Sequence, residues 1–199
     1  METLLAIFVG IGLAAACGFR IFVPLLVMSV ASLSGQLTLS PEFAWIGTYP
    51  ALAAFTIATI FEIAAYYVPW LDNLLDTVAV PAATVAGTIV MASAVSDMSP
   101  FLKWGLAVIV GGGVAGTVQG FTAITRIAST ATTGGLGNSV VSTAEAGGSF
   151  VMSILALAVP VLAAILVLAI LIVAFRKIYV WIFRRNKLGA EANNPRLNP

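Results

Sequence analysis

The sequence predicts an all-α, polytopic membrane protein with about five membrane-spanning segments. Of its 199 residues, 60% are hydrophobic and 9% are charged, whereas soluble domains are about 45–50% apolar and about 25% charged. The mean hydropathy is +1.07. So few charged side chains could not cover a folded surface in water. The chain also contains several apolar stretches of the length that a bilayer requires, which is about 20 residues.

These candidate spans cover approximately residues 4–33, 45–68, 77–96, 102–125 and 150–173. The first and fourth are long and rich in small residues. We expect each of them to be either a tilted long helix or a broken, re-entrant segment. Non-helical backbone at membrane depth is tolerated only where it is buried in protein or lines water. The fifth span carries Pro160 and is expected to continue toward residue 183.

The expected organisation is one transmembrane domain, residues 1–183, followed by a tail, residues 184–199. Basic residues are concentrated near the C-terminus, namely Arg176, Lys177, Arg184, Arg185, Lys187 and Arg196. The positive-inside rule places this end of the chain in the cytoplasm. With five spans, the N-terminus is expected on the opposite side of the membrane.

A weak internal repeat suggests two related halves, residues 1–68 and 102–183. The recurring residues are Gly10, Gly18 and Phe19 in the first half and Gly112, Gly120 and Phe121 in the second. In each half a Ser-, Thr- and Gly-rich stretch and a further span follow. Internal repeats of this kind are typical of transporter folds, whose binding sites lie where the halves meet.

Several classes of function are excluded or disfavoured by composition. The chain has no histidine and a single cysteine, Cys17, so histidine catalysis, histidine-ligated metals and an internal disulfide are excluded. A net charge of +1 provides no basic footprint for nucleic acid. No nucleophile motif is present. We therefore expect neither an enzyme nor a bound cofactor, and the sequence leaves any metal undetermined.

Two charged residues interrupt apolar stretches and are the first candidates for a binding site. A charge at the centre of a membrane helix costs about 2.5–3.5 kcal/mol on insertion scales. Arg20 is expected to hold an anionic head group or to form a structural pair, for which Glu62 is the natural partner. Glu62 shares a helix face with Tyr66, four residues later.

Asp72 and Asp76 form an acidic group just after Glu62 and the helix-ending Pro69. Their spacing predicts a short amphipathic helix with both carboxylates on one side. One interpretation is a site that takes up a proton or a cation, since oxygen ligands suit hard cations. The other is that both side chains are solvated at the membrane interface.

A run of hydroxyl and glycine residues follows Arg126, and its candidate site residues are Thr132, Thr133, Gly134, Gly135 and Asn138. Successive backbone N–H groups in such a run can form an anion-binding nest. Its hydroxyls could equally coordinate a cation or cap helix ends, and a flexible linker is a further possibility. We expect an ordered, membrane-embedded loop.

The remaining charged positions are easier to interpret. Glu145 is expected to start the fifth span or to pair with Arg126. Asp97 and Lys103 flank Pro100 in a short loop and are expected to be solvated.

Three groups of motifs resemble a bacterial integral-membrane family known only as a domain of unknown function. The first is Gly18-Phe19-Arg20 followed by Pro24. The second is Glu62 with Pro69-Trp70-Leu71-Asp72 and Asp76. The third is the run from Ser129 to Asn138, with Ser142 and Glu145. The resemblance covers roughly residues 4–173 and implies a multi-span protein of the bacterial cytoplasmic membrane in which these are motif positions.

The sequence favours a small transporter or channel for an anionic solute, an ion or a lipid head group. The buried charges and the two glycine-interrupted segments are the reasons. The alternative is a structural or lipid-binding component of a membrane complex. A chain of this size is expected to act as a homo-oligomer, such as a dimer. Gly112, Gly116 and Gly120 are spaced for close helix contact, within the chain or between copies.

Overall fold

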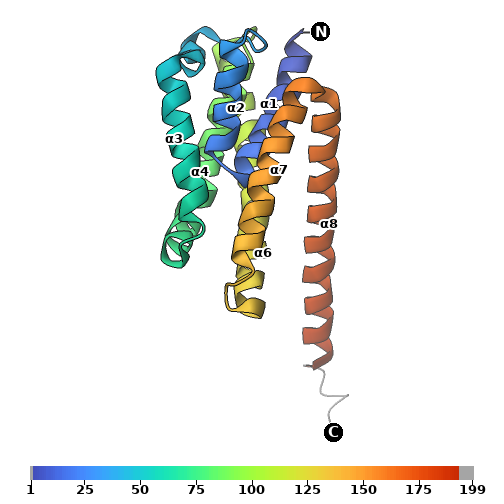
Figure 1. Cartoon of the computed structure of the whole chain (residues 1–199). Helices are drawn as coiled ribbons and strands as arrows, with labels where there is room; N and C mark the ends of the chain where they lie inside the picture. The colour runs from blue at the N-terminus through green and yellow to red at the C-terminus, as the bar shows by residue number, and fades with distance from the viewer. Residues whose placement is uncertain (1, 193–199) are drawn as a thin grey trace. The chain divides into compact units, whose positions relative to one another are not determined.

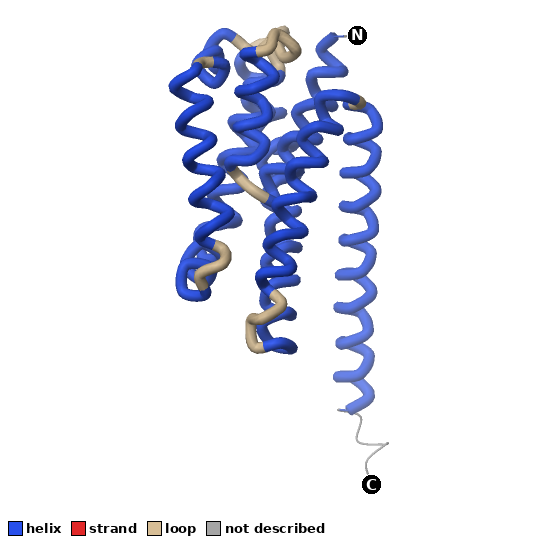
Figure 2. The backbone as a smooth tube through the Cα atoms, in the orientation of Figure 1, coloured by secondary structure: helices blue, strands red, loops and turns tan. Residues whose placement is uncertain are grey.

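A computed structural model of the chain describes residues 2–192 and shows helices joined by short turns (Figure 1). The elements are α1 (Glu2–Phe19), α2 (Phe22–Leu33), η1 (Pro41–Gly47), α3 (Tyr49–Ala65), α4 (Pro69–Ala94), α5 (Pro100–Leu106), η2 (Ala107–Gly112), α6 (Gly113–Thr133), α7 (Asn138–Ala158) and α8 (Pro160–Ala192). No strand occurs among residues 2–192 (Figure 2). The predicted all-α class is therefore confirmed.

The chain divides into two compact units, Met1–Val167 and Leu168–Pro199. Helix α8 crosses this boundary and continues to Ala192, beyond the predicted start of the tail at residue 184. Residues 193–199 of that tail lie outside the described residues. The first unit contains Arg20, Glu62, Arg126 and Glu145. The division into a domain, residues 1–183, and a cytoplasmic tail stays a prediction.

Four helical stretches are long and apolar enough to cross a membrane. They are Glu2–Phe19, Leu74–Ala94, Pro100–Thr133 and Asn138–Ala158. Helices η1 and α3, which are bent by 66° relative to each other, count as a fifth if they form one span. Two further apolar helices, Phe22–Leu33 and Pro160–Arg176, are shorter. The chain is thus a polytopic integral membrane protein, as predicted.

The first predicted segment is broken, and the break lies at Arg20. Helix α1 ends at Phe19 and α2 begins at Phe22, after which the chain runs back in the opposite direction (Figure 2). Pro24 explains the position, because its ring clashes with the carbonyl of the residue four positions earlier, Arg20, in a continuous helix. In the first turn of α2 its missing N–H is tolerated, since that group has no helical partner there.

Of the two alternatives expected for the fourth segment, the structure shows the long helix, Pro100–Thr133, rather than a broken segment. Helices α5, η2 and α6 follow one another without interruption, and only η2 departs from α geometry, as a π-helical stretch. The small residues of this segment allow it to pack closely against α4. A Cβ atom on Gly111 would lie 2.5 Å from the carbonyl oxygen of Gly87. Gly112 and Gly116 likewise face Thr84 of α4, whereas a Cβ on Gly120 would meet nothing within 4 Å.

The predicted fifth span, residues 150–173, is also wrong, because the chain turns at Val159. Helix α7 ends at Ala158 and α8 starts at Pro160, where proline is favoured because the first helical N–H needs no partner.

The stretch expected to be an embedded loop is mostly helical instead. Residues up to Thr133 belong to α6, and α7 begins at Asn138.

The two proposed repeats adopt different local structures. The first glycine-rich stretch ends at Phe19, where α1 stops, but α6 continues beyond Phe121 to Thr133. The relationship between the halves stays a prediction.

Helix α1 packs against α4, α6 and α7, and its small residues make that close packing possible. A Cβ on Gly12 would lie 2.6 Å from the Cβ of Ala156 on α7. A Cβ on Gly18 would lie 2.7 Å from the carbonyl oxygen of Ala115 on α6. This close approach places the end of α1, and therefore Arg20, between α6 and α7.

We expect Gly18→Ala to lower the free energy of unfolding by about 1–3 kcal/mol, because the added methyl group forces helix backbones apart. The matched control is Gly113→Ala on α6, where a Cβ meets nothing within 4 Å. That change should raise stability by about 0.5–1 kcal/mol through helix propensity alone. SDS titration of the purified variants in mixed micelles measures both effects, and equal stabilities would contradict the packing described above.

Candidate functional site

Arg20 is the best-buried charged residue of the site, with 1% of its surface exposed. The break between α1 and α2 directs its side chain toward α7. There Nη2 donates hydrogen bonds to the carbonyl oxygen of Ser142, at 3.0 Å, and to its Oγ, at 2.6 Å. Nη2 also lies 3.2 Å from Oε2 of Glu145. Arg20 thus forms an ion pair with α7.

The predicted pairing of Arg20 with Glu62 is wrong. The Glu62 carboxylate instead accepts hydrogen bonds from the backbone N–H of Ile21, at 2.7 Å to Oε1, and of Phe22, at 3.0 Å to Oε2. The reason lies in the helix break, which leaves the first N–H groups of α2 without carbonyl partners. A carboxylate at a helix N-terminus is also favoured by the helix dipole. Glu62 of α3 therefore caps α2.

The predicted pairing of Arg126 with Glu145 is confirmed. Nε of Arg126 donates to Oε1 of Glu145 at 3.1 Å, and Nη2 pairs with Oε2. Both side chains are buried. Glu145 lies within α7 rather than at the start of a span, and one of its oxygens serves both arginines. Helices α6 and α7 and the α1–α2 break are thereby joined through one carboxylate.

Asp76 of α4 completes the described network, with Oδ1 3.8 Å from Nη1 of Arg126. Asp76 is one of the two carboxylates predicted after Glu62. Asp72 lies in the first turn of α4, but its side chain is outside the described residues.

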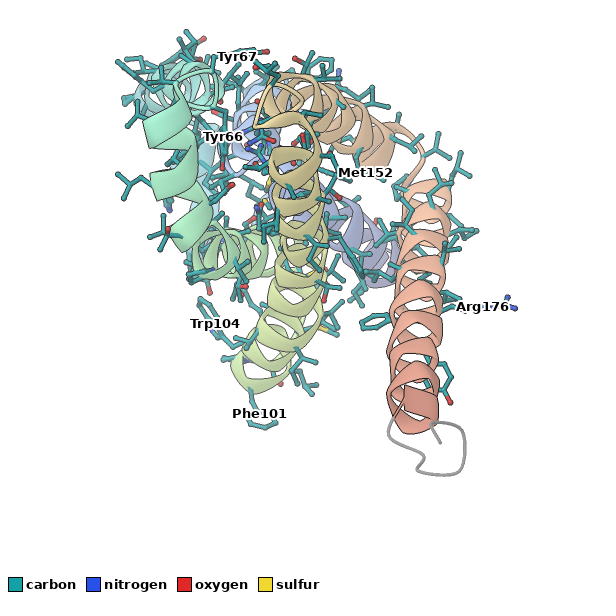
Figure 3. All side chains as sticks on the ribbon, turned by 90° about the horizontal axis from the view of Figure 1, so that it is seen from below. Tyr66, Tyr67, Phe101, Trp104, Met152 and Arg176 are labelled. Carbon is teal, nitrogen blue, oxygen red and sulfur yellow. The ribbon has the colours of Figure 1, made fainter. Side chains whose placement is uncertain are left out.

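Tyr66 contacts both guanidinium groups with its ring and was not among the predicted site residues. The guanidinium carbon of Arg20 lies 3.8 Å from the ring centroid, and that of Arg126 lies 4.1 Å from it. Figure 3 shows Tyr66 inside the bundle, and 9% of its surface is exposed against 49% for the neighbouring Tyr67. An aromatic face attracts cations, so one ring stabilises both arginines. The feature of the sequence that could have indicated Tyr66 is its spacing of four residues from Glu62, which places both side chains on one helix face.

The chain matches the family described as a domain of unknown function (DUF4126) over residues 7–179. The chain belongs to this family. The matched range contains every residue of the network, and the family expected from the sequence is confirmed. No curated protein and no solved structure matches this DUF4126 member.

The hydroxyl and glycine run of this DUF4126 member builds the turn between α6 and α7. Thr133 donates to the carbonyl of Ser129 at 2.7 Å and accepts from the N–H of Gly137 at 2.9 Å. Thr132 donates to the carbonyl of Ala128 at 2.9 Å. These hydrogen bonds of Thr132 and Thr133 thus remain within the hairpin formed by α6 and α7. Figure 2 places the turn at one end of the bundle, away from the α1–α2 break.

Three other residues of the run are held at the same turn. Gly134 and Gly135 adopt positive φ angles of 64° and 92°, a conformation that glycine adopts without strain. The side-chain amide of Asn138 donates to Oγ1 of Thr130 at 3.0 Å. Together these residues end α6 and start α7. Their hydrogen bonds correspond to the helix-capping role that the sequence left open.

The prediction that Lys103 is solvated is wrong, because only 5% of its surface is exposed. Its Nζ donates to Oγ of Ser40 at 3.0 Å and to Oε2 of Glu42 at 2.8 Å. These bonds fasten α5 to η1. Asp97 is exposed as predicted. Among the residues whose side chains the structure describes, no group of three or more His, Cys, Asp or Glu is arranged to hold a metal.

Two features of the network determine its chemistry. When ionised, Arg20 and Arg126 contribute two positive charges, and three carboxylates contribute three negative charges, from Glu62, Asp76 and Glu145. Among the described residues, Nε and Nη1 of Arg20 have no hydrogen-bond partner. Buried donors are usually satisfied. This DUF4126 member therefore combines a nearly balanced charge cluster with two guanidinium nitrogens that can still donate.

Proposed function

We propose that the chain is a small membrane transporter or channel that carries a small anion. The observation that supports this most strongly is the incomplete hydrogen bonding of Arg20. An arginine that only joins helices is expected to use its five N–H donors on carboxylates and carbonyls. Nε and Nη1 of Arg20 lack such partners among the described residues and can donate to the oxygens of an anionic solute or of a lipid head group.

The location of Arg20 supports the same proposal. It follows an apolar helix long enough to cross a membrane, and its side chain is buried against Ser142 and Glu145 of α7 and against the ring of Tyr66. Ionisable groups in such places generally mark ion and substrate pathways. The nearby carboxylates provide groups that can couple a proton or a cation to transport. We expect no catalytic activity and no resident cofactor.

Flux through proteoliposomes tests the proposal. We expect entry of nitrate, acetate or inorganic phosphate, or transbilayer movement of labelled phosphatidate, above the level of protein-free vesicles. Arg20→Met should reduce the active flux by about tenfold or more, since the loss of a charged hydrogen bond to a ligand costs at least about 1.4 kcal/mol.

The matched control is Arg176→Met, which removes an exposed arginine of the second unit (Figure 3) and should leave flux unchanged. Folded, monodisperse protein that moves none of the four probes would overturn the transport proposal.

The second candidate is a structural component of a membrane complex. The two-point contact between Arg126 and Glu145 is the observation that favours it, because it resembles a helix-joining pair. Such a component would co-purify with a partner in fixed stoichiometry from its native membrane. A chain isolated alone and still active in flux would exclude this candidate.

We further propose a homo-oligomer, with a dimer as the simplest form, in the bacterial cytoplasmic membrane with the C-terminus in the cytoplasm. The C-terminal basic residues support the orientation. Native mass spectrometry of the protein released from nanodiscs tests the first proposal, and protease accessibility of a C-terminal tag tests the second.

A further inference from the structure

We infer that the charged residues of the first unit mark the two faces of the membrane, and that the Arg20 network therefore lies at one face instead of at the centre of the bilayer. The partner of each charged level is the lipid head-group layer on that side. A ligand of the network then arrives from one head-group layer. This last step rests on the transport proposal, whereas the membrane position has evidence and a test of its own.

The charged residues are spaced along the sequence at intervals that match a membrane crossing. Four stretches of 17 to 22 residues contain no Asp, Glu, Lys or Arg, namely residues 3–19, 43–61, 77–96 and 104–125. A charged residue bounds each stretch at both ends, as Glu2 and Arg20 bound the first. A helix needs about 20 residues to cross the hydrocarbon core, and a charge within the core is costly. Each interval therefore has the length of one crossing.

The structure places the charges from one end of these intervals together. Nζ of Lys103 in α5 lies 2.8 Å from Oε2 of Glu42 in η1. Asp97 lies in the loop before α5, and Glu2 begins α1. Figure 1 shows the start of α1 and the link between α2 and α3, which contains η1, at the same end of the bundle. These four residues are the first charged level.

The charges from the other end of the intervals form the network described above. Its members are Arg20, Glu62, Asp76, Arg126 and Glu145, which we call the second charged level. Helix α1, whose 18 residues connect the two levels, is about 27 Å long at about 1.5 Å per residue. The hydrocarbon core is about 30 Å thick. The two levels are therefore separated by about one core thickness.

The longest helical stretch gives a second measure of this separation. Pro100–Thr133 contains 34 residues, which corresponds to about 50 Å at about 1.5 Å per residue. Even at a tilt of about 40°, the upper end of the usual range, it extends about 38 Å along the membrane normal and exceeds a core of about 30 Å. The stretch must therefore leave the core, and Lys103 and Arg126 lie toward its two ends.

The exposed side chains at the first charged level are of the two kinds that a membrane face attracts. Glu42 presents a carboxylate, and Trp45, Phe101 and Trp104 present aromatic rings. Figure 3 shows Phe101 and Trp104 at one end of the helical stretch that starts at Pro100. Tryptophan is enriched at the head-group level, because its ring is apolar and its N–H is polar. The bend of 66° between η1 and α3 lets η1 run along this face.

Between the two levels the spans present large apolar side chains to lipid. Examples on three different elements are the exposed Ile57 of α3, Val85 of α4 and Ile109 of η2. Ile109 lies on the same helical stretch as Trp104, so the aromatic rings of the first level continue the surface that faces lipid chains. The bilayer, rather than another protein, is therefore the partner that covers both.

Depth-dependent quenching of tryptophan fluorescence tests the membrane position. The chain has four tryptophans, and each variant retains or gains one while the others become phenylalanine. We use Trp104 for the first level and Tyr67→Trp for the second, since Tyr67 is exposed and directly follows Tyr66. Both should be quenched at least about twofold more strongly by phosphatidylcholine brominated near the head group than by phosphatidylcholine brominated near the chain ends.

Val85→Trp is the matched control, because Val85 is exposed near the middle of the interval 77–96. Bromine near the chain ends should quench it most. A Tyr67→Trp depth profile equal to that of Val85→Trp would place the second level within the core and overturn the inference. Protection of Trp104 from both lipids would show that protein covers the first level, and would overturn it as well.

Cysteine labelling gives a second measurement that does not depend on fluorescence. Cys17 is the single cysteine of the chain and is buried, so the unsubstituted chain is the control and should not react. A membrane-impermeant maleimide should label Asp97→Cys in intact cells or in inverted membrane vesicles, and Tyr67→Cys in the other preparation. Labelling of both variants from the same side, or no labelling of Tyr67→Cys, would overturn the inference.

Neither measurement involves flux, so the two proposals fail separately. Head-group depth at both levels without anion flux would overturn the transport proposal alone. A network at the depth of Val85, combined with flux, would overturn the membrane position alone.

Discussion

Replacing Glu145 with leucine is expected to lower the free energy of unfolding by about 3–5 kcal/mol, the usual result of removing one partner from a buried ion pair. Glu145 is 5% exposed and contacts both Arg20 and Arg126. Without this carboxylate, two buried guanidinium groups lose their shared counter-charge. The measurement is SDS titration in mixed micelles, followed by tryptophan fluorescence.

Asp97→Leu is the matched control, because Asp97 is an exposed carboxylate in the loop between α4 and α5. Substitutions of this kind usually change stability by less than about 0.5 kcal/mol. If both variants lost the same amount, the buried network could not be the cause.

A double variant separates charge from packing. Glu145→Leu alone leaves the guanidinium groups of Arg20 and Arg126 without their shared carboxylate. Combining it with Arg20→Met removes one of these two unpaired charges together with the carboxylate. The combined loss should be smaller than the sum of the two single losses by about 0.5–3 kcal/mol, because residues in direct contact are coupled. Additive losses would mean that Arg20 and Glu145 act independently.

The sequence predicts the membrane class for reasons that are local, and it offers the break in the first segment as one of two alternatives. Low charge and high hydropathy follow from the lipid solvent, and Pro24 fixes where α1 must end. The pairing of Arg126 with Glu145 was also accessible, since two opposite charges in an apolar region seek each other. The partner of Arg20 was not. Glu62 and Glu145 were both available, and the packing of α1 against α7 decides between them.

Two predictions are wrong because composition does not show where a membrane helix ends. Apolar residues can continue through a turn, and hydroxyl residues are tolerated within a membrane helix. The apolar stretch 150–173 conceals the turn at Val159, where only Pro160 indicates a new helix. Thr132 and Thr133 suggest a loop by composition, yet each donates its hydroxyl to a backbone carbonyl of α6. Such bonds allow serine and threonine to remain within a helix.

Lys103 shows a different limit of sequence interpretation. A lysine beside a loop is usually solvated, and nothing in its own neighbourhood predicts otherwise. Its burial depends on Ser40 and Glu42, which lie more than sixty residues earlier and are brought to it by η1. Long-range polar contacts of this kind depend on tertiary structure.

The second large effect is expected at Tyr66, where Tyr66→Leu should lower the free energy of unfolding by about 2–4 kcal/mol. The ring lies 3.8 Å from the guanidinium carbon of Arg20 and 4.1 Å from that of Arg126. A desolvated cation–π contact contributes about 2 kcal/mol, and leucine keeps apolar volume but has no π face. Tyr66→Phe keeps the ring and should retain most of the stability. Because two positive groups face one ring, Tyr66→Leu should also reduce anion flux through proteoliposomes by displacing Arg20, while Tyr66→Phe should not. Equal losses in the two variants would assign the role of Tyr66 to its hydroxyl group and contradict the stabilisation of two cations by its ring.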